Sequence, residues 1–237
     1  QILRQADMAM YRAKTAGKNT FRFFDEDMDV VIKRRVYLQQ QLEQAVRKDT
    51  AFSLRYQPQV NTLTGAVTGA EALIRWEVNP GEWVSPAEFI PLAEESGHIL
   101  PIGNWLLNNV FEQIANWNAQ GVNYGTISIN VSSVQLARDD LAKRILELMH
   151  NYAITAEQLC VEITETTLMT NSTQVVDNLT QLQEAGINLA IDDFGTGYSS
   201  MSYLKAIDAK YLKIDRSFII GIGTASSDEH IVRATIA

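Results

Sequence analysis

The chain has 237 residues, a formal net charge of -8 and a pI of about 4.9, a balance that argues against binding of polymeric nucleic acid. No apolar run approaches the ~20 residues of a membrane span, and the single cysteine, Cys160, excludes an intrachain disulfide. We therefore expect a globular domain in a reducing cytoplasm, without membrane contact from this segment. Because the chain starts at Gln1, we expect upstream sequence, where a sensor or membrane-attached region could lie.

The first 24 residues have the pattern of a small helix and strand. Residues 6–14 are helical in pattern, Gly17 is placed to end that helix, and residues 20–24 are predicted to form a short strand. A unit of this size is too small to fold alone. We therefore predict that residues 1–24 are the C-terminal remnant of another α/β domain.

Residues 25–50 are charged and rich in helix-forming residues, which predicts a linker helix. Apolar residues recur in them at helical spacing, as expected of a helix with one buried face. The predicted stripe consists of Val36, Leu38, Leu42 and Val46.

From residue 51 onward, strand and helix patterns alternate, which is typical of an α/β fold. Helices are predicted at residues 85–97, 101–120 and 173–185, and the first has Ser85 as N-cap, Pro86 at N1 and Glu88 at N3. Several strands are rich in Val, Ile and Leu, as in a parallel sheet that is buried on both faces. The candidate strands are 53–60, 67–74, 126–131, 159–163, 187–192 and 211–214.

Polar residues recur late in successive predicted strands. In a (β/α)8 barrel these strand ends converge on one face, whereas an open sheet would spread them along an edge, so the pattern favours a barrel. The residues are Glu71, Asn130, Glu162, Asp192, Asp193 and Lys213.

The four carboxylates of this set lie in apolar surroundings, where an ionised carboxylate is costly unless it is paired or bound to metal. Carboxylate and amide oxygens suit hard cations, which predicts Mg²⁺ or Mn²⁺. The adjacent Asp192 and Asp193 allow one aspartate to bridge two ions. Two ions can activate water and stabilise both oxygens in phosphodiester cleavage.

Several of these residues lie in motifs that resemble, in order, those of the EAL family of bacterial cyclic di-GMP phosphodiesterases. Glu71-Ala72-Leu73-Ile74-Arg75 resembles the ExLxR signature, and the likeness covers about residues 33–237. The other motifs are Tyr56-Gln57-Pro58, Ser128-Ile129-Asn130-Val131-Ser132, Glu162-Ile163-Thr164-Glu165, Asp192-Asp193-Phe194-Gly195-Thr196-Gly197-Tyr198-Ser199-Ser200 and Lys213-Ile214-Asp215-Arg216-Ser217-Phe218.

This resemblance implies a modified (β/α)8 barrel that hydrolyses cyclic di-GMP to linear pGpG. It implies one metal ion on Glu71, Asn130, Glu162 and Asp192, and a second on Asp192 and Asp193. Lys213 would position the attacking water or a phosphate oxygen, and Glu165 would anchor the glycine loop. The substrate contacts would come from Gln57, Leu73, Arg75 and Asp215.

The N-terminal residues resemble the end of a GGDEF domain, through the AD-x-AMYRAK-x-x-GKN pattern, although the cyclase signature itself is absent. At the other end, the EAL pattern continues beyond residue 237 with two further strands. We therefore expect residues 51–237 to be a C-terminally incomplete EAL domain, whose activity as a separate chain is an open question.

Alternatives remain open at this point. A non-catalytic cyclic di-GMP receptor would use the same fold, and a regulatory scaffold would bind partner proteins instead. A homodimer is compatible with the resemblance. Taken alone, Asn130 could be a strand-end turn residue, Lys213 a surface lysine and Asp215 either a base contact or a turn cap.

Overall fold

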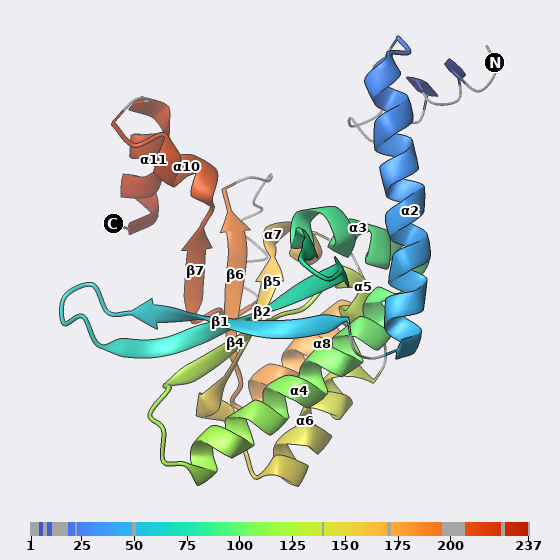
Figure 1. Ribbon diagram of the computed structural model, residues 1–237. Helices are drawn as coiled ribbons and strands as arrows, with labels where there is room; N and C mark the ends of the chain where they lie inside the picture. The colour runs from blue at the N-terminus through green and yellow to red at the C-terminus, as the bar shows by residue number, and fades with distance from the viewer. Residues whose placement is uncertain are drawn as a thin grey trace. The chain divides into compact units, whose positions relative to one another are not determined.

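The computed structural model describes residues 5–6, 9–10, 19–21, 23–48, 51–138, 140–169, 172–195, 207–223 and 226–236. The chain divides into two compact units (Figure 1). One combines Gln1–Ala51 with Trp76–His98, and the other combines Phe52–Arg75 with Ile99–Ala237. The predicted division into a remnant, a linker helix and a main domain stays a prediction.

In the first unit, helix α2 (Glu26–Lys48) forms where the linker helix was predicted. Its buried face carries Leu38, Leu42 and Ala45 at helical spacing. Met28, in the first turn of the helix, is also buried. Val36 is 49% exposed, so its place in the predicted stripe was wrong. The reason is helical geometry, since two residues turn Val36 about 200° away from Leu38.

The same unit contains strand β3 (Glu82–Val84) and helix α3 (Pro86–Ser96). Arg34 of α2 forms ion pairs with Glu82 at 2.8 Å and with Glu88 at 3.1 Å. Helix α3 begins after Ser85 and ends at Gly97, as predicted, but the Ser85 side chain makes no capping hydrogen bond. Strand β3 was not predicted, because three residues are too few to show a period.

The predicted N-terminal helix lies mostly outside the described residues, of which Gln5–Ala6 and Ala9–Met10 are helical. The predicted strand at residues 20–24 is wrong, since its described residues have no strand structure. Phe21 and Phe23 are 74% and 81% exposed, and their rings pack edge to face at 5.5 Å. A strand is stabilised by pairing, and none is found for this segment among the residues that the structure describes.

The second unit is built on a largely parallel sheet, which confirms the α/β prediction. Its strand order is β1-β2-β4-β5-β6-β7, and β2 to β7 run parallel in that order. This succession of parallel strands fits the predicted modified (β/α)8 barrel. The strands are β1 (Phe52–Val60), β2 (Val67–Asn79), β4 (Thr126–Asn130), β5 (Leu159–Thr164), β6 (Asn188–Phe194) and β7 (Tyr211–Ile214).

Helices α4 (Ile99–Ala119), α6 (Leu141–Tyr152) and α8 (Thr173–Glu184) cover one face of this sheet (Figure 1). They bury the aliphatic residues that alternate along the strands, among them Ile127, Ile129, Leu189 and Ile191. None of the described helices combines the length and apolarity that a bilayer span requires. The shorter elements are α5 (Ser133–Leu136), η1 (Ala156–Gln158), α7 (Glu165–Leu168), α10 (Arg216–Ile220) and α11 (Ser226–Ile236).

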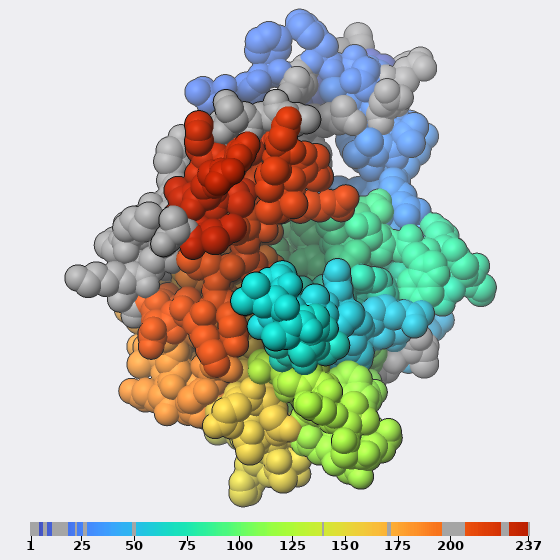
Figure 2. Space-filling view, turned by 90° about the vertical axis from the view of Figure 1, so that its left-hand side faces the viewer, coloured from blue at the N-terminus to red at the C-terminus, as the bar shows by residue number. Residues whose placement is uncertain are grey.

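Strands β1 and β2 are joined by a tight hairpin turn. The Asn61 side chain accepts hydrogen bonds from the backbone N–H groups of Leu63 and Thr64, at 3.0 and 2.9 Å, and Gly65 takes the left-handed φ of 70° that the turn requires. Figure 2 shows this hairpin, in cyan, at the surface of the face turned to the viewer. The turn thus fixes the register of β2, the strand that carries Glu71.

Candidate active site

The strand registers place the polar side chains of the sheet in staggered rows on the face away from the covering helices. Side chains alternate between the two faces of a strand, so residues two apart share a face. Glu71 lies opposite Ser128, which lies opposite Cys160; Asn130 lies opposite Glu162; and Thr164 lies opposite Asp192. The stagger brings residues from different rows to one place.

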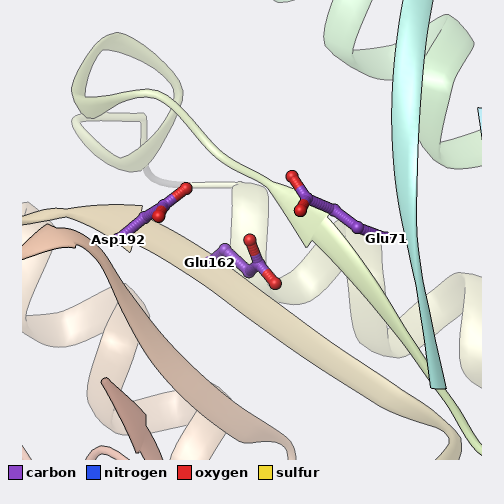
Figure 3. A group of neighbouring side chains, drawn as sticks. All are labelled: Glu71, Glu162 and Asp192. Atoms are coloured by element: carbon purple, nitrogen blue, oxygen red, sulfur yellow. The ribbon is translucent and has the colours of Figure 1, made fainter. Parts of the chain in front are cut away.

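The prediction that Glu71 lies late in its strand was wrong, because β2 continues eight residues beyond it to pair with β3. It nevertheless reaches the site, since it lies one row below Asn130 and Glu162. The carboxylates of Glu71, Glu162 and Asp192 each offer one oxygen within 4.8 Å of the others. Figure 3 shows the three side chains pointing toward one another from β2, β5 and β6.

The Lys213 ammonium lies among these three carboxylates. Its Nζ donates to Glu71 Oε2 at 3.1 Å and to Asp192 Oδ2 at 2.9 Å, and it also donates to Glu162 Oε2. Asn130 joins the group, since its Nδ2 donates to Glu71 Oε1 at 2.7 Å. The structure therefore brings together five of the predicted site residues.

The electrostatics of the cluster reflect an excess of negative charge. Burial raises the pKa of Glu162, whose side chain is 1% exposed, and the charge of Glu71 raises it further against the opposing effect of Lys213. Burial lowers the pKa of Lys213, but the hydrogen bonds and charges of Glu162, Asp192 and Glu71 outweigh it and raise that pKa above the ordinary value. The lysine is therefore held protonated beside carboxylates that outnumber it.

Asp193 lies beside this cluster, with its backbone in the left-handed region at a φ of 53°. Its N–H donates to Asp192 Oδ1 at 2.9 Å. Burial and the charges of Asp192 and Asp215 raise the pKa of Asp193. Among the described residues, the carboxylates that converge as a possible metal site are Glu71, Glu162 and Asp192. Asp193 is not one of them, so its role as a ligand stays a prediction.

Asp215 caps helix α10, accepting hydrogen bonds from the backbone N–H of Ser217 at 2.9 Å and from its hydroxyl. These bonds lower the pKa of Asp215. The turn-cap alternative is therefore observed for this residue. Contact between Asp215 and a base stays a prediction, which the cap does not exclude.

Glu165 is the first residue of α7 and is buried. Its Oε2 accepts a hydrogen bond from the backbone N–H of Gly195 at 3.0 Å, which ties α7 to the start of the glycine loop. Residues 196–200 of that loop lie outside the described residues. The contact agrees with the anchoring role expected of Glu165, which stays a prediction.

The three remaining candidates lie on strands β1 and β2, without contacts that test their roles. Gln57 is exposed on β1, and Leu73 is half-buried on the same face of β2 as Glu71. Arg75 is half-buried, and its Nη1 donates to the backbone oxygen of Ile74 at 2.9 Å. Substrate contact by these residues stays a prediction.

Sequence reasoning assigned no role to Ser128, which the structure places beneath the cluster. It is buried, and its hydrogen bonds oppose part of the rise that burial causes in the pKa values of Glu162 and Cys160. The available signal was its position two residues before Asn130, on the same face of β4. Hydrogen bonds of this kind orient metal ligands.

The donor set fits a hard divalent cation. Three carboxylates and one amide supply only oxygen ligands, and one carboxylate is buried where an unbalanced negative charge is costly. Asn130 can present its amide oxygen by a half-turn of the amide group. These residues could therefore hold a metal ion.

Comparison with known proteins agrees with this geometry. The EAL domain family matches residues 39–237. The chain is 37% identical over its whole length to the bifunctional diguanylate cyclase/cyclic di-GMP phosphodiesterase MucR of Pseudomonas aeruginosa, of which it spans 34%. It is 33% identical to the cyclic di-GMP phosphodiesterase NbdA of the same organism, of which it spans 30%. The chain thus spans about a third of the length of these curated relatives.

Solved structures show the same fold. The phosphodiesterase of PaMucR, in complex with c-di-GMP, matches with a TM-score of 0.78 at 37% identity, covering 84% of this chain and 80% of that one. The EAL enzyme Bd1971, with cAMP and cyclic di-GMP bound, matches with a TM-score of 0.79 at 28% identity, covering 100% and 62%. From residue 39 to residue 237, this chain belongs to the EAL domain family.

Proposed function

We propose that this chain carries the catalytic site of a metal-dependent phosphodiesterase that hydrolyses cyclic di-GMP to linear pGpG in bacterial second-messenger signalling. The observation that carries the proposal is the convergence of Glu71, Glu162 and Asp192 with Lys213. The names of the relatives MucR and NbdA, and the bound ligand of the PaMucR structure, support the same substrate.

In this proposal, Glu71, Asn130, Glu162 and Asp192 hold one Mg²⁺ or Mn²⁺ ion, and Asp192 and Asp193 hold a second. Bound divalent cations lower the pKa of water and offset phosphate charge. Water adds across one of the two phosphodiester bonds, so that the phosphate stays on one ribose and the other ribose regains its hydroxyl.

The remaining candidates orient the reactants. Lys213 positions the attacking water or a phosphate oxygen, and Glu165 holds the glycine loop through Gly195. The dinucleotide is contacted by Gln57, Leu73, Arg75 and Asp215. We place the whole protein in the cytoplasm. We propose that it forms a homodimer. Residues 1–24 would be the end of a GGDEF domain.

The test is to incubate the natural protein that contains this chain with cyclic di-GMP and Mg²⁺, and to follow pGpG by chromatography. We expect pGpG to form and its formation to stop on addition of EDTA. Glu71→Ala should lower turnover by about 10³-fold or more, whereas the matched control Glu157→Ala, at an exposed site on η1, should not. Binding that persists in EDTA without any product would favour the receptor instead.

A further inference from the structure

The cluster that would bind metal already holds a cation that belongs to the chain. The Lys213 ammonium lies within hydrogen-bonding distance of Glu71, Glu162 and Asp192. These are the same three residues whose oxygens converge within 4.8 Å. The lysine side chain is 27% exposed and that of Glu162 only 1%, so this ion-pair network is partly shielded from water.

We infer that Lys213 is a resident counter-ion, which holds the three carboxylates together before metal binds and which metal must displace. The inference rests on the proposed metal site and concerns its state without metal. Lys213 is in this role a positioning residue, since it acts through the carboxylates.

Geometry makes the two cations exclusive at these oxygens. An ion such as Mg²⁺ binds oxygen ligands at about 2.1 Å. Lys213 Nζ lies 3.1 Å from Glu71 Oε2 and 2.9 Å from Asp192 Oδ2. Its third partner is Glu162 Oε2. An ion bound to the same oxygens would therefore lie in contact with the ammonium and repel it. The ammonium would have to move away, toward the water or phosphate oxygen that it is proposed to contact.

Lys213 reduces the electrostatic repulsion among the three carboxylates. Without any cation, three carboxylates would lie within 4.8 Å of one another, one of them buried, and would repel. The lysine removes part of this repulsion in the metal-free protein, but it leaves an excess of negative charge that still attracts a divalent ion. It therefore keeps the ligands in place while lowering the affinity for metal.

The test compares Lys213→Met with wild type, as the chain or the natural protein that contains it. In EDTA, the variant should unfold at a temperature lower by about 6 °C or more. Its Mn²⁺ affinity, measured from the free Mn²⁺ signal by electron paramagnetic resonance, should rise about tenfold or more. Lys213→Arg, which keeps the charge, should stay within about 2 °C of wild type in EDTA, as should the control Lys210→Met at an exposed site three residues away.

An unchanged melting temperature in EDTA, or weaker Mn²⁺ binding by Lys213→Met, would overturn the inference. If Lys213→Met is unfolded in EDTA and folds when Mn²⁺ is added, the inference is supported, because metal then replaces the lysine. If it is unfolded under both conditions, the inference fails. Neither measurement uses cyclic di-GMP, so absence of phosphodiesterase activity would refute the proposed function and leave this inference standing.

Discussion

Replacing Glu162 by glutamine should separate the function of the cluster from the stability of the fold. The change keeps the size of the side chain and removes one negative charge from a site where three carboxylates face one ammonium. We expect turnover of cyclic di-GMP to fall by about 10³-fold or more, because the neutral amide removes the negative charge with which this carboxylate would bind a hard cation.

The stability of the metal-free protein should change little. At an effective dielectric constant of about 20, each repulsion of Glu162 by Glu71 or Asp192 is worth about 3.5 kcal/mol if the charges are taken at 4.8 Å, the upper limit of the separation between their oxygens. The attraction by Lys213 at hydrogen-bonding distance is worth about 5.5 kcal/mol. The two repulsions together offset the one attraction, and the partial exposure of Glu71 and Asp192 weakens them somewhat. The net change should therefore lie within about 1 kcal/mol, or about 2–4 °C in melting temperature.

The assay is thermal unfolding in EDTA, followed by circular dichroism, beside chromatography of pGpG with Mg²⁺ present. The pH dependence checks the sign. Because burial raises the pKa of Glu162 in the folded state, wild type should lose stability relative to Glu162→Gln as pH rises from the ordinary glutamate pKa through the raised value. A loss of more than about 10 °C in the variant at pH 7 would refute the charge balance, and retained turnover would refute the ligand role.

Three further predictions test other parts of the fold. Gly195→Ala should lower turnover about tenfold or more, because Gly195 has a φ of 97° and an added Cβ would lie 2.9 Å from Phe218 Cε2. We expect kcat to fall while the melting temperature stays within a few degrees of wild type. Asn178→Ala should destabilise the protein by about 2–3 kcal/mol in urea unfolding, because the buried Asn178 side chain forms hydrogen bonds with the backbone of α5, α6 and α8, including one to Leu136 O at 2.9 Å. A change below about 0.5 kcal/mol would contradict this. Cys160 should react slowly with a thiol reagent at pH 8 and quickly in denaturant, because burial raises the pKa of its thiol to about 12. Rapid reaction of native protein would show that the strand opens.

Most strands could be predicted from the sequence because their aliphatic residues meet a strong physical demand. Ile127 and Ile129, for instance, must be buried against helices, and that demand makes β4 visible without any tertiary information. The prediction of a strand at residues 20–24 was wrong for the converse reason. Phe21 and Phe23 have the composition of a strand, but composition cannot supply the pairing partner that a strand requires.

The members of the site could be predicted better than its geometry. Glu71 was expected near the end of its strand, yet β2 runs on to pair with β3, whose three residues gave no signal. Its distance from Glu162 depends on the stagger between strands, and stagger is set by pairing registers that the sequence does not show directly. Ser128 was missed for the same reason, since its hydrogen bond to Glu162 crosses from one strand to the next.

The position of Lys213 shows why residue type alone is insufficient to assign a role. A lysine at the end of a strand is compatible with a surface charge, a phosphate ligand or a counter-ion, and its contacts with three carboxylates bear on the first of these alternatives. The surface alternative is excluded, because the ammonium donates to a carboxylate that is 1% exposed. Under the proposed function, the other two would describe successive states of one side chain, before and after metal binds. If the measurements on Lys213→Met agree with the inference, this site of like charges uses one residue both to stabilise its metal-free form and to act when metal is bound.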